Sequence, residues 1–187
     1  EFTVNNDVNI AASGARINNH DGTNGKYLKV GHDFTVGVNA RFDSQLGTSG
    51  FTGRLNLNGS TLQTVTVDPA GFFGGSAAGV NSTSNVANVL SSLEVTNTST
   101  TSPNVIWNAD AIRIKSGLVL TSGRVRIAGG KRLILGNFSQ LLTSGLSVTS
   151  GFGFTSGTVS RWMSTANTDN VQAGTEYPGT STASTPN

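Results

Sequence analysis

Two histidines, each followed by an aspartate, are the first residues in this chain to weigh as metal ligands. The pairs His20–Asp21 and His32–Asp33 together offer two imidazoles and two carboxylates. Their spacing matches neither the helical nor the paired-strand pattern of a zinc site. We therefore interpret both pairs as solvent-facing turn residues, and we expect neither a resident metal nor a cofactor.

A calcium site is the alternative for residues 18–25, which begin with Asn18 and end with Gly25. The segment reads NNHDGTNG and is rich in the hard oxygen ligands that calcium prefers. It lacks the several carboxylates of a tight site, and Asn, Asp and Gly are also the residues that any turn requires. We interpret the segment as a turn, with calcium binding left open.

Catalytic constellations find little support in this chain. Hydrolysis of sugars needs two positioned carboxylates, and Glu94 and Asp110 are the pair that a coiled chain could bring together. A lyase would need a base near clustered acids, and Lys115 and Arg113 near Asp110 are faint candidates that strand-edge ion pairing explains equally well. There is no Gly-x-Ser-x-Gly elbow followed by a helix and no phosphate-binding loop. We expect a protein that is not an enzyme.

Threonines recur at alternate positions in two places. Thr64 and Thr66 form one Thr-x-Thr pair, and Thr96, Thr98 and Thr100 form a second series. Ice-binding solenoids repeat such pairs in register, but these do not recur once per coil. Cross-strand threonine pairing is the plainer explanation.

The elements that position these residues are short strands. Residues 112–137 (IRIKSGLVLTSGRVRIAGGKRLILGN) alternate apolar and polar side chains in four short runs, separated by Ser-Gly, Ser-Gly and Gly-Gly. Such alternation predicts half-buried strands, and the turns are too brief for a crossover helix. Further strands are expected on both sides of a turn at residues 31–33 and of a corner at Gly59, followed by a long loop over residues 68–88 in which Phe72 and Phe73 pack.

The spacing of the Ser-Gly turns predicts a chain wound in coils. The step from Gly123 to Gly145 is 22 residues, within the usual length of a β-solenoid coil, so the chain would make about eight coils. We predict an all-β fold, a right-handed parallel β-helix (β-solenoid) over residues 1–172. Residues 173–187 are then a Ser/Thr/Gly/Pro-rich linker or disordered tail. A β-sandwich of short strands is the alternative.

Composition limits the functional class. Only 12% of the 187 residues are charged, whereas Ser, Thr and Asn make up roughly a third, a surface that is common on secreted proteins. Cysteine is absent, which excludes disulfides and thiolate chemistry. No apolar run is long enough for a membrane helix, so we expect no membrane insertion. Six basic residues lie close together in the sequence without interleaved aromatics, which predicts a solvated face and no nucleic-acid binding: Arg113, Lys115, Arg124, Arg126, Lys131 and Arg132.

Several segments resemble the β-helical repeat regions of large secreted surface proteins from Bacteroidetes bacteria. The segments are residues 54–67 (RLNLNGSTLQTVTV), 90–99 (LSSLEVTNTS) and 112–137, with residues 156–162 and 176–180 resembling the closing part of those regions. The resemblance implies a secreted or cell-surface protein with a role in adhesion or scaffolding. It also implies export by the type 9 (gliding-associated) secretion machinery. Because the family's C-terminal sorting domain is not found in this sequence, we expect it to be a fragment of a longer protein.

We therefore expect a non-enzymatic extracellular stalk or adhesin segment of a bacterial surface protein. Its Thr/Ser/Asn-rich surface would contact glycans or other proteins, and the exposed edge of its last coil predicts end-to-end self-association into filaments. A carbohydrate-active enzyme or carbohydrate-binding module on a β-helix scaffold is the alternative, which a clustered acidic groove would favour. Ice or mineral binding would require a flat, in-register threonine array.

Overall fold

The protein is built from β-strands joined by turns and bends, and the parts of the chain that the structure describes contain no helix. This confirms the all-β class that the short alternating runs predict. The computed structural model describes residues 1–11, 13–19, 26–45, 53–75, 89–135, 147–148, 153–162 and 176–180.

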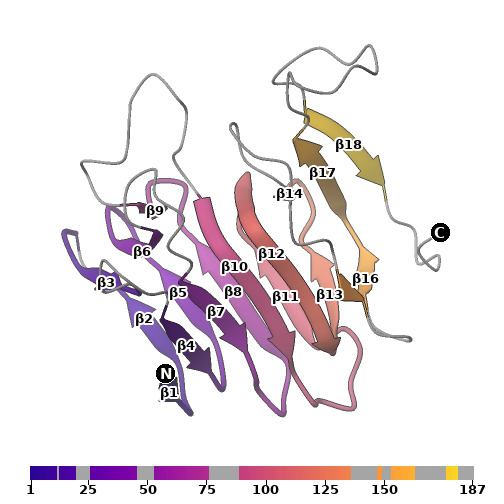
Figure 1. Cartoon of the computed structure of the whole chain (residues 1–187), viewed down its shortest axis with the longest axis horizontal. Coiled ribbons are helices and arrows are strands. Elements are labelled where there is room, and N and C mark those ends of the chain that lie inside the picture. The colour runs from indigo at the N-terminus through magenta and orange to yellow at the C-terminus, as the bar shows by residue number, and fades with distance from the viewer. Residues whose placement is uncertain are drawn as a thin grey trace.

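The strands form three sheets, in which neighbours are distant in the sequence (Figure 1). Sheet A contains β1 (Phe2–Val4), β4 (Tyr27–Val30), β7 (Arg54–Leu57), β10 (Val89–Thr96), β12 (Ile112–Ser122), β14 (Arg132–Leu135), β17 (Thr158–Trp162) and β18 (Glu176–Thr180), with β15 (Ser147–Val148) beside β12. Sheet B contains β2 (Val8–Ile10), β5 (Phe34–Val36), β8 (Gln63–Val67), β11 (Val105–Asn108), β13 (Arg124–Ile127) and β16 (Gly153–Ser156). Sheet C contains β3 (Arg16–Asn18), β6 (Arg41–Gln45) and β9 (Phe72–Gly75).

The order of the strands along the chain explains why the sheets are parallel. The first nine strands visit sheets A, B and C in turn, three times, and we call each such passage a circuit: β1–β3, β4–β6 and β7–β9. Parallel neighbours need a long connection, and here the strands of the other two sheets supply it. Every described strand pair is parallel except β17–β18, which is antiparallel.

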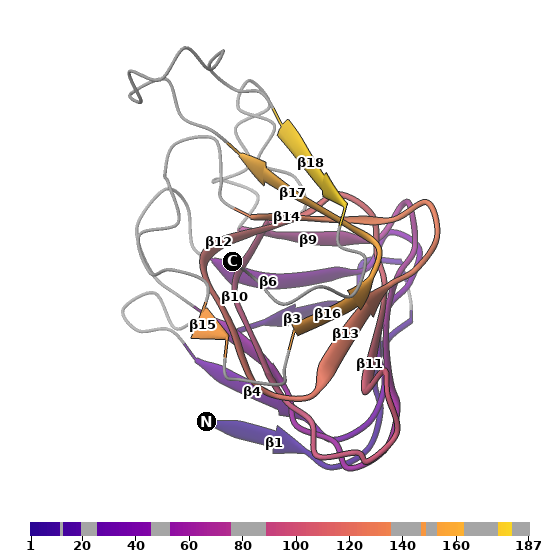
Figure 2. The same cartoon turned by 90° about the vertical axis from the view of Figure 1, so that its right-hand side faces the viewer.

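Buried side chains from all three sheets belong to one apolar cluster. In Figure 2, β11, β13 and β16 lie along one side, β6 and β9 across another, and β4, β10 and β12 along the third. Inward side chains stack in register from circuit to circuit, as Leu28, Leu55 and Leu93 do in sheet A. Aromatic rings fill the region between sheets B and C, where the ring centroids of Phe34 and Phe42 lie 5.0 Å apart. Burial of this kind contributes about 1.5–3 kcal/mol per large side chain.

Two of the expected turns are confirmed. The turn at residues 31–33 joins β4 to β5, and the corner that contains Gly59 lies between β7 and β8. A Cβ at Gly31 would lie 2.5 Å from the backbone oxygen of Asn5, and one at Gly59 would lie 2.5 Å from that of Gly31. Glycine is therefore required because successive corners stack with their backbones in close approach.

The predicted turn at Ser116–Gly117 is wrong. Residues 112–122 form one continuous strand, β12, which runs through the position where two strands were expected. Along its neighbour β10, Leu90 pairs with Ile114 and Ser92 pairs with Gly117, so β12 has one residue more than β10 between these pairs. The serine and glycine are thus accommodated as a bulge within a long strand. The turns at Gly123 and at Gly129–Gly130 are confirmed.

The long loop expected over residues 68–88 is also partly wrong. Phe72–Gly75 form β9, which pairs with β6 through Arg41 with Phe72 and Phe42 with Phe73. Phe73 points into the core and is fully buried, whereas Phe72 is partly exposed. The two phenylalanines therefore lie on opposite faces of β9. Residues 76–88 lie outside the described part of the chain.

The repeat is less regular than the predicted 22 residues. Residues paired in neighbouring strands of sheet B are 20 positions apart at Val105 and Val125 but 42 apart at Val65 and Trp107. The described residues pass through sheet B six times. The expectation of about eight coils in the whole chain stays a prediction. Within the expected tail, residues 176–180 form β18 against β17. The boundary at residue 172 stays a prediction.

Candidate functional site

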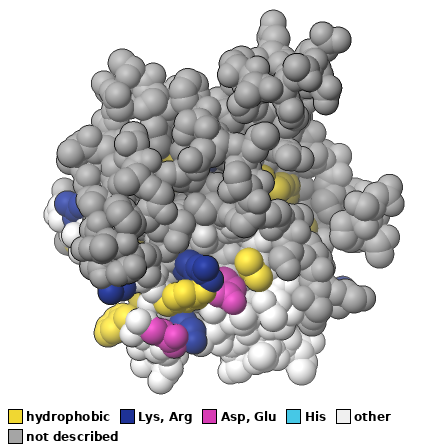
Figure 3. Space-filling model, in the orientation of Figure 1, with side chains coloured by type: hydrophobic (Ala, Val, Ile, Leu, Met, Phe, Trp, Pro, Cys, Tyr) yellow, Lys and Arg dark blue, Asp and Glu magenta, His cyan; other side chains and the backbone are white. Residues whose placement is uncertain are grey.

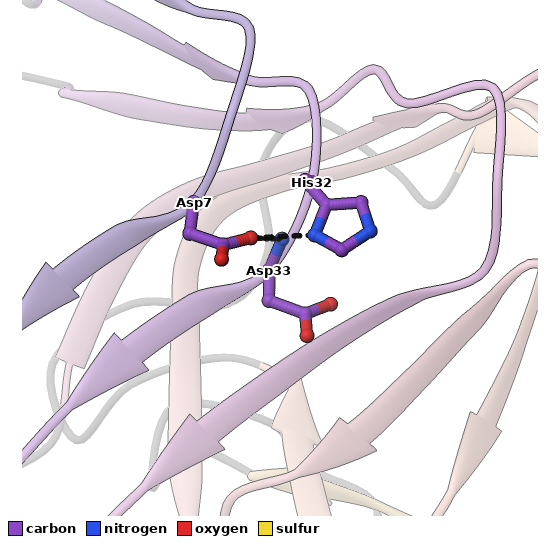
Figure 4. A group of neighbouring side chains, drawn as sticks. All are labelled: Asp7, His32 and Asp33. Atoms are coloured by element: carbon purple, nitrogen blue, oxygen red, sulfur yellow. Dashed lines mark hydrogen bonds and ion pairs between the residues drawn. The ribbon is translucent and has the colours of Figure 1, made fainter.

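Three side chains that could bind a ligand meet at two stacked corners near the start of the chain. Asp7 directly precedes β2, and His32 and Asp33 directly precede β5. Because Val8 pairs with Phe34 in sheet B, the parallel register places Asp7 beside Asp33. Figure 4 shows the carboxylate of Asp7 at the edge of the imidazole and that of Asp33 below it. We call these residues the Asp7–His32–Asp33 cluster.

Hydrogen bonds hold both carboxylates of this cluster in place. The Asp33 amide donates to Asp7 Oδ1 over 3.1 Å, and Asp7 Oδ1 also lies 2.5 Å from His32 Nδ1. One circuit further on, the Thr64 amide donates to Asp33 Oδ1 over 2.7 Å. Each aspartate therefore ties its own corner to the corner of the next circuit.

Later corners repeat this tie without a histidine. Asn104 Oδ1 accepts a hydrogen bond from the Arg124 amide over 2.6 Å, and Asp110 Oδ1 accepts one from the Arg132 amide over 3.1 Å. A carboxylate or amide that caps the next strand is thus a structural feature of the fold. What distinguishes the first two corners is an imidazole that lies close to two carboxylates.

The electrostatics of the cluster follow from these contacts. The hydrogen bond with His32 lowers the pKa of Asp7, and the bond from the Asp33 amide lowers it further. The same bond with Asp7 raises the pKa of His32, with an additional contribution from the charge of Asp33. Both side chains are exposed, so water screens the interaction.

A pH dependence of stability follows from these two shifts. The raised pKa of His32 gives stability that is complete below its ordinary pKa of 6.5 and is lost as the pH rises through the raised value. The lowered pKa of Asp7 gives stability that is complete above 3.8 and is lost as the pH falls through the lowered value. In buffer that contains a chelator, the melting temperature of the wild type should exceed that of His32→Gln most clearly near about pH 5, where His32 is protonated and Asp7 is ionised. The difference should shrink above neutral pH, and an equal difference at all pH values would contradict the pairing.

Of the two His–Asp pairs weighed as metal ligands and interpreted as turn residues, only His32–Asp33 lies among the described residues. His20 and Asp21 lie outside the described residues, as does most of the segment expected as a calcium alternative. At its start, Asn18 ends β3, and the buried Asn19 donates from Nδ2 to the Arg54 carbonyl over 3.0 Å. Asn19 therefore serves to join circuits.

The two carboxylates considered for sugar hydrolysis lie on different elements. Glu94 is in β10 of sheet A, where its register neighbours are Asn56 and Val119. Asp110 lies in the turn after β11 and caps β14. Arg113 lies in β12, and the side chain of Lys115 is outside the described set. The absence of enzymatic activity stays a prediction.

The two threonine series differ in structure. Thr64 and Thr66 lie on the outer face of β8, and Thr66 pairs in register with Thr35 of β5. In the second series, Thr96 ends β10 and donates from its hydroxyl to Asn56 Oδ1 over 2.8 Å, whereas Thr98 and Thr100 follow the strand. Sheet B therefore carries an in-register pair of threonines, Thr35 and Thr66, and an asparagine lies in register on either side of the pair.

Sequence reasoning missed the contribution of Asp7. A weak signal was present, because DVNI at residues 7–10 and DFTV at residues 33–36 both place an aspartate directly before an alternating strand. It also missed Asp43, which is fully buried and forms ion pairs with Arg16 and Arg41. Burial raises the pKa of Asp43, and the charges of Arg41 and Arg16 oppose that shift. This group links β3 to β6.

No protein-family model, curated protein or solved structure matches the chain. The function must therefore be argued from its own residues. Within the described ranges there is no helix of the length and apolarity needed to span a membrane.

Proposed function

We propose that the chain is a right-handed parallel β-helix. Three observations support this: parallel pairing, strands that visit three sheets in turn, and one apolar core shared by all three sheets. A β-sandwich would be built from antiparallel sheets, and the antiparallel pair described here is β17–β18. The right hand is that of nearly all parallel crossover connections.

We infer that this fold serves as a non-enzymatic extracellular stalk or adhesin module of a bacterial surface protein. The resemblance to secreted Bacteroidetes repeat regions supports the location and the route of export. In the part of Figure 3 where described side chains are visible, acidic and basic groups lie next to one another, so neither sign gathers alone there. Such a surface suits contacts with neutral partners better than with nucleic acid.

The observation that carries the adhesive role is a polar column on the outer face of sheet B. Asn9, Thr35, Thr66 and Asn108 stand in register on four successive strands. Each lies between two inward-facing buried residues, so each faces away from the core. Strands about 4.8 Å apart present this Asn–Thr column as a regular row of hydroxyl and amide groups. Such a row can donate and accept hydrogen bonds along an extended glycan.

A glycan array with the purified chain tests this proposal. We expect binding without cleavage, and we expect Thr66→Arg to weaken it by about tenfold or more, which corresponds to about 1.4 kcal/mol, because the long side chain covers the column. Thr121→Arg is the matched control, since Thr121 is an exposed threonine of β12 in sheet A. That variant should bind as the wild type does.

Other outcomes would contradict specific parts of the proposal. Equal loss in both variants would show that the Asn–Thr column is not the contact surface. Release of shortened glycans would overturn the non-enzymatic role and favour the alternative of a carbohydrate-active enzyme. If no glycan on the array bound the chain, glycan adhesion would be contradicted, and the stalk role with proteins as partners would remain.

A further inference from the structure

The Asp7–His32–Asp33 cluster has the composition of an open metal site. One imidazole and two carboxylates converge from two successive circuits, and a ligand atom from each lies within 4.8 Å of the other two. Asp7 and His32 are exposed and Asp33 is half-buried, so a hydrated ion can reach all three groups.

Each carboxylate has an oxygen to spare. The backbone amides of Asp33 and Thr64 hydrogen-bond to the Oδ1 atoms of Asp7 and Asp33 respectively. A carboxylate has two oxygens that can accept, so the Oδ2 atoms remain for an ion while the Oδ1 contacts fix their direction. Ligating carboxylates are normally held by such outer hydrogen bonds.

The donor set selects the class of metal. An imidazole nitrogen with carboxylate oxygens suits Zn²⁺ and its first-row neighbours, whereas Ca²⁺ and Mg²⁺ prefer a shell made of oxygen alone. Bonds of about 2.0–2.2 Å in a tetrahedral site place ligand atoms roughly 3.3 Å apart. Rotations of the exposed Asp7 and His32 side chains can bring the three groups to this spacing. The two carboxylates also neutralise the charge of a divalent ion.

We propose that Asp7, His32 and Asp33 form a Zn²⁺ site that joins the first circuit to the second, with water in the fourth position. The ion would act as a removable tie at this end of the described core. This inference rests on the cluster alone and does not depend on the adhesive role proposed above.

Calorimetric titration of the metal-free chain with ZnCl₂ tests the site. We expect one ion per chain and a melting temperature that rises with zinc concentration, since a ligand that binds only the folded state stabilises it. His32→Gln should abolish both effects. Asp7→Asn and Asp33→Asn keep an oxygen for the backbone hydrogen bonds, and each should weaken binding by more than about tenfold. Circular dichroism of each variant confirms that it is folded.

Three controls make the result specific. Asp110→Asn alters a carboxylate that caps the next strand without a histidine beside it, and it should bind zinc as the wild type does. His20→Gln removes the other histidine and should also have no effect. Ca²⁺ and Mg²⁺ at the same concentrations should not raise the melting temperature. No zinc binding by the wild type, full binding by His32→Gln, or loss of binding in His20→Gln would each overturn the proposal.

Discussion

Replacement of Gln63 by leucine is expected to lower the free energy of unfolding by about 2–4 kcal/mol. The Gln63 side chain is fully buried and makes four hydrogen bonds at the corner between sheets A and B. Its Oε1 accepts from the Gly59 amide over 2.9 Å and from Asn97 Nδ2 over 2.8 Å. Its Nε2 donates to the carbonyls of Val30 over 2.9 Å and His32 over 2.6 Å. One side chain thus connects three successive circuits.

The size of this effect depends on which partners keep another bond. The Val30 carbonyl still accepts from the Asn58 amide over 3.0 Å, and Asn97 Nδ2 still donates to the Thr61 carbonyl over 2.8 Å. The Gly59 amide and the His32 carbonyl lose the side-chain partner described for them. A buried polar group left without a partner costs about 1–3 kcal/mol, so two such groups cost about 2–6 kcal/mol, and the apolar surface that leucine buries offsets part of this cost to give the expected range.

Urea denaturation followed by circular dichroism measures the change. The control is Thr66→Val in the same strand, which alters a half-exposed outer residue and should change the free energy of unfolding by less than about 0.5 kcal/mol. If Gln63→Leu were as stable as Thr66→Val, the buried network would not hold the corner together.

Gln63 also shows how far the sequence could predict the fold. The strands of sheets A and B were predictable where apolar residues alternate with polar ones, as in QTVTV of β8 and YLKV of β4. The alternating pattern does not predict the hydrogen bonds of Gln63, because its partners lie at residues 30, 32, 59 and 97. Only the stacking of circuits brings these positions together.

Sheet C was the part of the fold that the pattern did not predict. In β6, Phe42, Asp43 and Ser44 are all buried, so the strand has no alternation of apolar and polar side chains. Asp43 is compensated by two arginines, and Ser44 Oγ accepts a hydrogen bond from the Ser91 amide over 2.9 Å. Burial of polar residues with partners elsewhere in the chain hides a strand from any analysis based on periodicity.

The sequence predicted the turn at His32–Asp33 but not the third member of the candidate site, Asp7. The turn at His32–Asp33 was expected from its position between two alternating runs, but Asp7 is 25 residues from His32. From the sequence alone, His20 and Asp21 were the residues weighed as further metal ligands beside His32–Asp33, and both pairs were interpreted as turn residues. Strand register, which depends on the length of each circuit, decides instead that Asp7 is the neighbour. Circuits of unequal length make such a neighbour unpredictable from spacing.

Replacement of Trp107 by alanine is the second change for which we expect a large effect, a loss of about 3–5 kcal/mol in the free energy of unfolding. Trp107 is fully buried in β11, in register between Val65 and Ile127 of the neighbouring strands. Its ring centroid lies 6.5 Å from that of Phe73, so it extends the aromatic packing from sheet B towards sheet C. Alanine would leave a cavity that strands held on both sides cannot close.

Trp107→Phe separates the loss of volume from the loss of the indole. The buried indole Nε1 has no hydrogen-bond partner among the described residues, so phenylalanine removes an unsatisfied donor and keeps most of the apolar ring. We expect it to cost less than about 1.5 kcal/mol. Thermal and urea unfolding of the three proteins measures both differences. If phenylalanine proved as costly as alanine, the indole nitrogen would have a partner that stabilises the fold. If alanine cost little, β11 would not lie at the centre of a shared core, and the parallel β-helix proposed here would lose its main support.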